Sequence, residues 1–500
     1  MMSTRPFAPS RQQPGTPDGP YSCRRALLMA TVALSCWMTA TGTAQAPDRS
    51  KPPAPGPVPT LKVPPIGKHT LSNGLPVWIV EMHGVPVVDV AVLIRSGGND
   101  DPAGKFGLAH FTAAMLDEGA GARSALELSD AVDFLGATLT TSSSFDASFA
   151  QLHTVVSKFD AALPLLADVV LRPTFPQTEI DRLRQQRLTT LVQMRDNPAQ
   201  LASSAFSGLL YGGQHRYGTV IMGGEAVNRT LSQADMRQFY ATHYQPQNAH
   251  IIVAGDIRAA AILPKLERAL GGWKNSGAVP KITLPAAPQP ASRQIYLIGK
   301  ADAAQSQIRI GAVGVARSTP DYFVLDVLNT MLGGSFTSRL NQNLREEHGY
   351  AYGAGSGFAM RLGAGPFVAQ AGVQTDKTVE SLTEFFKELD GIHAPPPEDE
   401  VTRAKNLQAL SFPSSFETTS DMTGHLMDLV IYGLPESFFN DYVPKIQAVR
   451  VADVERAAKQ YLVTNRMIVV VAGDLSKIEQ PVRSANLAPV TVVDPATMLK

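Results

Sequence analysis

The feature that most constrains the fold is an internal repeat. A stretch with helical character begins at Ala234-Asp235 and ends in an apolar strand, 251–254, followed by Gly255-Asp256; the same pattern recurs from Ala452-Asp453 onward. Both ends of the pattern are displaced by 218 residues without a gap. Such a period is far longer than the roughly 20–45 residues of solenoid repeats. The sequence therefore favours two tandem homologous domains over the three units that 500 residues alone suggest.

Each half mixes strands and helices without a regular alternation of the two. Asn73-Gly74 lies between two apolar stretches, which is a hairpin signal, and the β-branched run 87–94 predicts a strand. The segment 107–116 has the pattern of a helix, and the 218-residue offset places the strand at Val90 on Ile308. We therefore expect an α+β fold, in which each domain is a mostly antiparallel sheet with helices packed on one face.

The two ends of the chain and its proline-rich segments predict the domain boundaries. Fifteen uncharged residues, 26–40, follow two arginines and precede small residues, which is typical of an export signal; we expect cleavage after Ala44, with an uncleaved anchor as the alternative. Such a signal implies export, and we expect the mature chain in the periplasm of a bacterial cell envelope. The predicted segments are a signal peptide 1–44, a linker 45–66, an N-terminal domain 67–275, a linker 276–293, a C-terminal domain 294–485 and a tail 486–500.

Composition excludes several classes of function. Lys+Arg and Asp+Glu number 44 each, so no net charge attracts nucleic acid. Both cysteines, Cys23 and Cys36, lie in the predicted signal peptide. The mature chain therefore has no thiol for a disulfide, an iron–sulfur cluster or a nucleophile. No Gly-x-Ser-x-Gly motif occurs, and no two of the ten histidines are three or four residues apart.

The segment 106–119, Phe-Gly-Leu-Ala-His-Phe-Thr-Ala-Ala-Met-Leu-Asp-Glu-Gly, together with the hairpin before it and Asp-Asn-Pro at 196–198, resembles the pitrilysin/insulysin family of zinc metallopeptidases. The resemblance extends over nearly all of 67–480. In the family motif His-x-x-Glu-His, the two histidines bind zinc and the glutamate activates water. His110 matches the first histidine, but Ala113 stands at the glutamate and Ala114 at the second histidine. The stretch 182–195, where the family has its third ligand, contains no carboxylate. The resemblance thus implies a degenerate motif without metal.

The second half resembles the family's C-terminal signature. Met-Leu-Gly-Gly-Ser-Phe-Thr-Ser-Arg-Leu at 331–340 is followed by Arg345 and, seven residues later, Tyr352. In the family this arginine holds the substrate backbone, and the tyrosine hydroxyl stabilises the oxyanion of the tetrahedral intermediate. Tyr350 is a competing candidate because it lies two residues away, on the same face of a strand.

The segment 136–143 matches the family's edge strand beside the zinc site. In the family a substrate pairs there as an added strand, which implies substrate contacts at Thr140, Thr141 and Ser142. An ordinary polar edge strand explains the same residues equally well.

The asymmetry between the halves carries the functional prediction: three groups of the zinc half are lost, whereas the Arg–Tyr signature is intact. The resemblance implies the non-zinc-binding subunit of a heterodimeric, exported zinc metallopeptidase that processes or degrades peptides, its two domains forming half of a clamshell. It implies no cofactor on this chain, zinc on a homologous partner with an intact motif, and no membrane span after signal removal. The alternative is a catalytically inactive homologue that acts as a scaffold or peptide-binding protein.

Overall fold

A computed structural model describes residues 56–58, 60–281 and 283–495 of the chain. The described residues from 57 onward form one compact unit. The predicted signal peptide, 1–44, and the first part of the predicted linker lie outside the described residues. Within the described ranges, no helix has both the length and the apolar character that a membrane span requires.

The N-terminal half is built on a six-stranded sheet. Its strands lie in the order β1 (Gly67–Thr70), β2 (Pro76–Glu81), β8 (Ala249–Gly255), β3 (Val87–Ile94), β7 (Ser148–Val155) and β6 (Thr138–Ser143). All neighbouring pairs are antiparallel except β2 and β8. Strand β3 shows why the sheet forms: Val90 and Val92 point to one buried face, while Ala91 and Leu93 point to the other.

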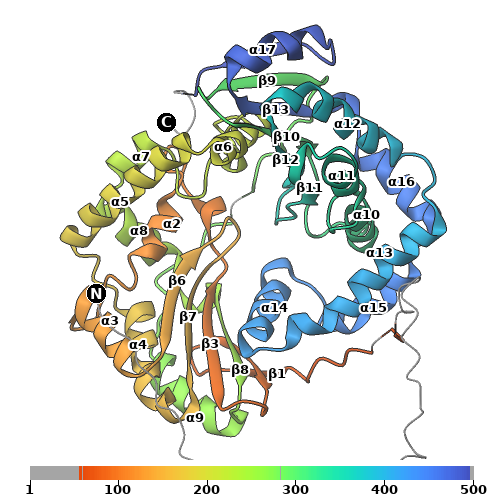
Figure 1. Cartoon of the computed structure of the whole chain (residues 1–500). Helices are drawn as coiled ribbons and strands as arrows, with labels where there is room; N and C mark the ends of the chain where they lie inside the picture. Colours follow the sequence, from red (N-terminus) through yellow and green to blue (C-terminus); the bar gives the residue numbers. More distant parts are fainter. Residues whose placement is uncertain (1–55, 59, 282, 496–500) are drawn as a thin grey trace, which may run out of the picture. The chain divides into compact units, whose positions relative to one another are not determined.

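The C-terminal half repeats this sheet. Its strands lie in the order β11 (Ala351–Phe358), β12 (Pro366–Gln374), β10 (Gln305–Val313), β13 (Ile468–Gly473), β9 (Gln294–Gly299) and β14 (Val490–Val493). Strands β11, β12, β10, β13 and β9 take the places that β6, β7, β3, β8 and β2 have in the first sheet. The first residue of β10 lies 218 positions after the first residue of β3. The predicted α+β class with two sheet-containing halves is confirmed (Figure 1).

Helices accompany each sheet. In the N-terminal half they are α2 (Leu108–Ala114), α3 (Ala125–Phe134), α4 (Phe159–Leu171), α5 (Gln177–Asp196), α6 (Pro198–Tyr211), α7 (Glu225–Thr230), α8 (Gln233–His243) and α9 (Ala259–Leu270). In the C-terminal half they are α10 (Tyr322–Leu332), α11 (Arg339–Asn341), α12 (Thr378–Gly391), α13 (Glu398–Ser411), α14 (Thr419–Tyr432), α15 (Phe438–Ala448), α16 (Val451–Tyr461) and α17 (Leu475–Ser484). Each half's main core lies between its sheet and its own helices.

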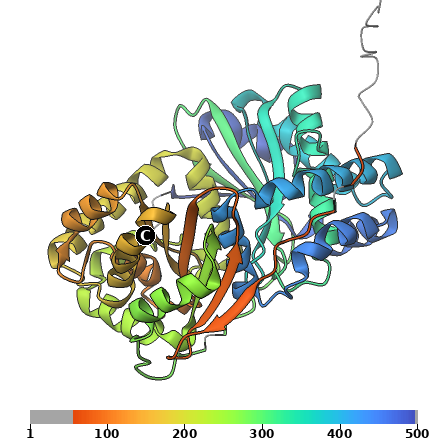
Figure 2. The same cartoon turned by 90° about the horizontal axis from the view of Figure 1, so that it is seen from below.

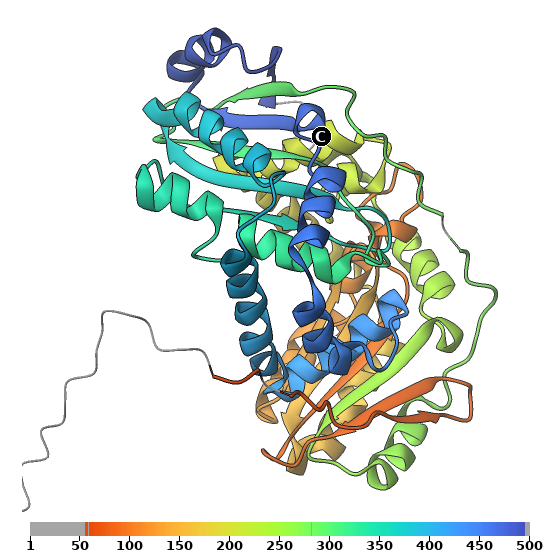
Figure 3. The ribbon, with the colours of Figure 1, turned by 90° about the vertical axis from the view of Figure 1, so that its right-hand side faces the viewer.

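One helix of each half packs on the sheet of the other half. Helix α6 places Leu201 and Phe206 in a cluster with Val470 of the C-terminal sheet. Helix α14 places Leu426 in a cluster with Ala91 and other residues of the N-terminal sheet. Figures 1 and 2 show α14 beside the strands of the N-terminal sheet, and Figure 3 shows the two halves from the side. The exchanged helix therefore covers the sheet face that each half's own helices leave open.

Candidate functional site

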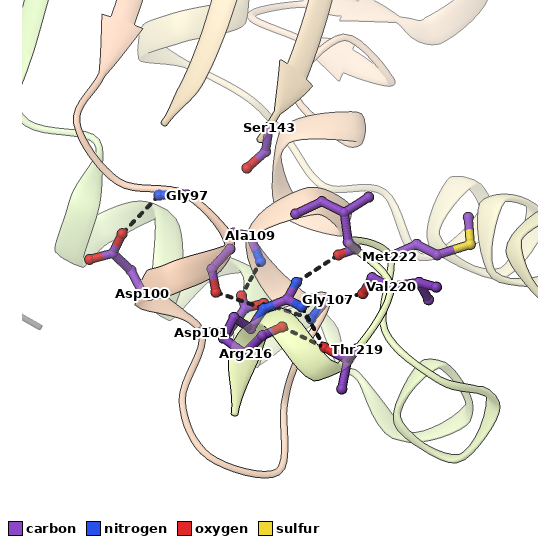
Figure 4. A network of polar contacts seen from close by, with 12 residues as sticks. Gly97, Asp100, Asp101, Gly107, Ala109, Ser143, Arg216, Thr219, Val220 and Met222 are labelled. Carbon is purple, nitrogen blue, oxygen red and sulfur yellow. Dashed lines mark hydrogen bonds and ion pairs between the residues drawn. The ribbon is translucent and has the colours of Figure 1, made fainter. Parts of the chain in front are cut away.

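A buried carboxylate fixes the start of α2, the helix that carries His110. Asp101 accepts hydrogen bonds from the backbone N–H groups of Gly107 and Ala109, both at 2.6 Å (Figure 4). Gly107 has φ of 108° and lies against the Met222 carbonyl, which leaves no room for a Cβ atom. Asp101 thus acts as a cap for the first turn of α2.

Arg216 compensates the charge of Asp101. Its Nε lies 3.0 Å from the Asp101 carboxylate, and both side chains are almost fully buried. Of the other guanidinium nitrogens, one donates to Thr219 Oγ1 (Figure 4). The second donates to the carbonyl oxygen of Ile221. Burial raises the pKa of Asp101 to about 6, while Arg216 and the two backbone donors act in the opposite direction. The network holds α2 in one position relative to the 216–222 loop.

A second arginine contacts His110 itself. Arg187 of α5, only 5% exposed, donates from one terminal nitrogen to His110 Nδ1 at 2.8 Å. Its other nitrogens donate to Asn228 Oδ1 at 2.7 Å and to the Met222 carbonyl at 2.6 Å. Burial, and next to it the charge of Arg187, lowers the pKa of His110 to about 4. The imidazole is therefore neutral at pH 7 and accepts the arginine's hydrogen bond.

The residues around His110 do not fit a catalytic zinc ion. Ala113 is buried and Ala114 is on the same short helix, so neither predicted motif position offers a ligand atom. Helix α5, where the family places a carboxylate, instead presents a guanidinium to the one imidazole. A catalytic zinc needs three protein ligands, and a fixed positive charge beside the imidazole opposes a divalent cation. Across the residues with described positions, no group of three or more His, Cys, Asp or Glu side chains is arranged to hold a metal ion.

The predicted substrate-contacting residues Thr140, Thr141 and Ser142 lie on β6, the last strand of the N-terminal sheet. Strand β6 pairs with β7 on one side, and among the described residues no backbone hydrogen bond reaches its other edge. Thr141 Oγ1 donates to Asp117 at 3.1 Å, and burial raises the pKa of that carboxyl to about 6. The free edge has the geometry that an added strand requires.

The structure brings Arg345 and Tyr352 together. Arg345 lies in a π-helical turn, Gln342–Glu347, and Tyr352 lies near the start of β11. The Arg345 guanidinium carbon is 5.3 Å from the centroid of the Tyr352 ring and 4.7 Å from that of Phe336. Its Nε is 3.2 Å from Glu346 Oε1. The Tyr352 side chain is 88% exposed, so its ring and hydroxyl face solvent.

The competing candidate, Tyr350, is placed differently. Its ring stacks on His348 with centroids 4.9 Å apart and packs against the core of the C-terminal half. Tyr350 is only partly exposed, and among the described residues its ring makes no cation–π contact with Arg345.

Sequence reasoning missed two features of this region. Arg187 lies within the stretch 182–195, 77 residues after the lone motif histidine, and a cation at this position is itself a signal that zinc is absent. The second feature is a hollow of about 410 Å³ beside Phe336, over β10, β11 and β12. Its lining residues are uncharged apart from Arg309, and they come from four separate segments, so no local motif identifies it.

Comparison with known proteins agrees with this architecture. A family model described as Insulinase (Peptidase family M16) matches residues 77–216, and one described as Peptidase M16 inactive domain matches 230–408. The uncharacterized zinc protease SCO5738 of Streptomyces coelicolor is 23% identical over 79% of this chain and 87% of its own length. The uncharacterized zinc protease YmxG of Bacillus subtilis is 24% identical over 79% of this chain and 95% of its own.

A solved structure shares the whole fold. The crystal structure of a peptidase M16 inactive domain from Pseudomonas fluorescens superposes with a TM-score of 0.76 and 26% identity, covering 82% of this chain and 98% of that one. The two family models together span both halves of the molecule, each of which carries the repeated sheet. The chain therefore belongs to peptidase family M16, the insulinase/pitrilysin-like proteins.

Proposed function

We propose that this chain is the non-zinc-binding subunit of a heterodimeric, exported zinc metallopeptidase that processes or degrades peptides. Arg345 and Tyr352 act on a substrate whose zinc and general base belong to a homologous partner with an intact His-x-x-Glu-His motif. The chain itself needs no cofactor for this role. The observation that carries the proposal is the pairing of Arg345 with a Tyr352 ring that is 88% exposed.

The chemistry of the pair suits acyl transfer. The Arg345 guanidinium donates hydrogen bonds to peptide carbonyl oxygens, and its stacking between Phe336 and Tyr352 limits the orientations of its plane. The Tyr352 hydroxyl donates to an oxyanion as negative charge develops on it. Because no hydrogen bond from this hydroxyl is present among the described residues, it is available to a substrate bound by a second subunit.

The N-terminal half supports the same division of roles. The Arg187 guanidinium beside His110 disfavours zinc on this chain, which supports a role in which the partner carries the metal. The free edge of β6, with Thr140, Thr141 and Ser142, would hold an extended peptide by backbone hydrogen bonds.

The test is a purification of the tagged full chain from its own cell envelope, followed by measurement of zinc content and peptidase activity. We expect an equimolar, zinc-carrying homologue to copurify. Arg345→Ala and Tyr352→Phe should each lower kcat of the complex about 100-fold, the size of effect seen when one oxyanion donor is removed. Tyr350→Phe is the matched control and should retain activity within about twofold, because the Tyr350 ring packs on His348 instead.

A second candidate function is a peptide-binding or scaffold protein without catalysis. The free β6 edge favours it, since strand addition requires neither Arg345 nor Tyr352. If the chain purifies alone and zinc-free, without peptidase activity, or if both variants of the complex keep full activity, the shared active site is wrong and this second function replaces it.

A further inference from the structure

Three arginines of the described chain are buried, namely Arg187, Arg216 and Arg309. They differ in the groups that face their charge. Arg216 forms an ion pair with the Asp101 carboxylate, and Arg187, which donates to the neutral imidazole of His110, also interacts with the charge of Asp101. Arg309, in β10, is 7% exposed and has no carboxylate within ion-pair distance among the described residues. It lines the hollow of about 410 Å³ over β10, β11 and β12.

Every hydrogen-bond partner of Arg309 is neutral. Nε donates to Ser203 Oγ at 3.0 Å, and one terminal nitrogen donates to the Ile308 carbonyl at 2.8 Å. The other terminal nitrogen donates to the Ala199 carbonyl at 3.1 Å. Ser203 and Ala199 belong to the exchanged helix α6. A guanidinium has five N–H donors, so these three bonds leave two unused.

The sheet offers Arg309 no counter-charge either. Its partner in register on β12 is Gln370, and its partner on β13 is Val470. Side chains directly opposite on neighbouring strands have Cβ atoms about 4.5–5.5 Å apart, so a carboxylate at position 370 would neutralise Arg309. Burial lowers the pKa of Arg309 to about 10, which still leaves the group charged at neutral pH. An unpaired buried charge is costly, and here it lies at the wall of an open hollow.

The remaining walls of the hollow suit a peptide. Gln307 and Gln370 supply side-chain amides that donate and accept hydrogen bonds. Gly372 makes room for Gln307, because a Cβ atom at this position would lie 2.6 Å from its Nε2. Phe336 lines the hollow and also stacks on Arg345, so the hollow adjoins the Arg345–Tyr352 pair.

We propose that this hollow is a subsite for a peptide carboxylate, which pairs with the Arg309 guanidinium while Gln307 and Gln370 contact the adjoining peptide groups. The inference rests on the proposed function, since one bound peptide would contact both the subsite and the Arg345–Tyr352 pair. The carboxylate is either the peptide's C-terminus or an acidic side chain, and both present the same two oxygens to the guanidinium.

The test is fluorescence anisotropy with the full chain and three versions of one labelled peptide of about ten residues. The first has a free C-terminus and one internal glutamate, the second is amidated at the C-terminus, and the third has glutamine in place of the glutamate. We expect one of the two modified peptides to bind about tenfold more weakly than the first, which identifies the source of the carboxylate.

Two variants connect this preference to Arg309. Arg309→Gln should abolish the preference for the unmodified peptide. The affinity for the modified peptide that binds more weakly to the wild-type chain should stay within about twofold. Gln370→Glu should also abolish it, because the new carboxylate lies opposite Arg309; position 370 is exposed, so this variant is expected to fold. Ser203→Ala is the control: it removes one hydrogen bond of Arg309 but keeps the charge, and should retain the preference.

The inference is overturned if the wild-type chain binds all three peptides equally or binds none, or if both Arg309→Gln and Gln370→Glu keep the preference. These outcomes are distinct from a failure of the proposed function. A preference that depends on Arg309, found in a chain whose Arg345 and Tyr352 are dispensable, would support the subsite and refute the shared active site.

Discussion

The two edge strands β6 and β11 occupy the same position in the two repeated sheets, yet their outer edges differ. Among the described residues, no backbone hydrogen bond reaches the outer edge of β6. On β11, the Ala354 N–H donates to Asn341 Oδ1 at 3.2 Å and the Ser356 N–H donates to the Gly333 carbonyl at 3.1 Å. The 333–341 segment therefore covers the outer edge of β11, whereas the corresponding edge of β6 is open.

The comparison shows that the two copies of a duplicated sheet differ in the groups they present at the same edge. The N-terminal sheet retains backbone groups that a further strand can use. The C-terminal sheet has closed those groups and presents side chains instead, namely Arg345, Tyr352 and the hollow at Arg309. The predictions below test this difference.

The largest effect is expected where the network that positions α2 beside β6 is broken. Arg216→Met leaves the Asp101 carboxylate buried without a counter-charge, so the free energy of unfolding should fall by about 3–5 kcal/mol in urea denaturation. Arg229→Met is the control, because Arg229 forms an exposed pair with Glu225 and should cost less than about 1 kcal/mol. A loss below about 1 kcal/mol for Arg216→Met would mean that the pair does not anchor α2.

The pH dependence of stability should report on His110. Its native pKa is about 4 and its ordinary value is 6.5, so below pH 6.5 the unfolded chain binds a proton that the native chain does not. The free energy of unfolding therefore holds this contribution in full above pH 6.5. Between pH 6.5 and pH 4 it should fall by on the order of 3 kcal/mol.

The measurement is the difference in unfolding free energy between wild type and His110→Gln at several pH values. Taking the difference removes the opposite contribution of Asp101, whose pKa is raised and which is present in both proteins. A difference that stays constant between pH 7 and 4 would contradict the assignment of a neutral imidazole beside Arg187.

Proline at one outward-facing N–H position of each edge strand should separate binding from stability. Ala354→Pro removes the N–H that Asn341 accepts and should cost about 2 kcal/mol of stability. Thr141 is expected to point its N–H outward, because the Ser144 N–H bonds to the Ala147 carbonyl in the same β6–β7 hairpin and bonded positions alternate.

Thr141→Pro should therefore weaken peptide binding about tenfold at little cost in stability. Thr141→Ala is its control, since it loses the same hydroxyl contact with Asp117 and keeps the N–H. Equal peptide affinities of the two Thr141 variants would show that β6 does not bind peptide by strand addition.

The smallest effect is expected from zinc. One equivalent of zinc added to the isolated chain should shift Tm by less than about 1 °C, because no three His, Cys, Asp or Glu side chains among the described residues are arranged to hold a metal ion. A shift of several degrees that is lost in His110→Gln would refute the metal-free assignment.

Much of the fold follows from the sequence because its signals are local. The run 87–94 is a strand with the predicted bounds, Asn73-Gly74 precedes β2 as a turn, and the 218-residue offset relates β3 to β10. Alternation of apolar side chains along a strand depends only on neighbouring residues, so one sequence suffices to recognise it.

The parts that the sequence did not predict are contacts between distant segments. Nothing local in 198–211 or 419–432 specifies that each helix covers the other half's sheet, because an amphipathic face fits any apolar surface of the right shape. The same holds for the site. Arg345 and Tyr352 are seven residues apart and were predicted, whereas Arg309 meets Ser203 from 106 positions away and was not.

The exchange of α6 and α14 has a consequence for the origin of the chain. A single ancestral half would expose one face of its sheet, the face on which the partner's helix now packs. Two separate copies that traded this helix would form a closed, two-fold symmetric swapped dimer. Fusion of the two genes would make the trade intramolecular, with the connecting segment keeping the copies at high effective concentration. The ancestor that this arrangement implies is an obligate homodimer, and neither half of the present chain should be isolable as a folded monomer.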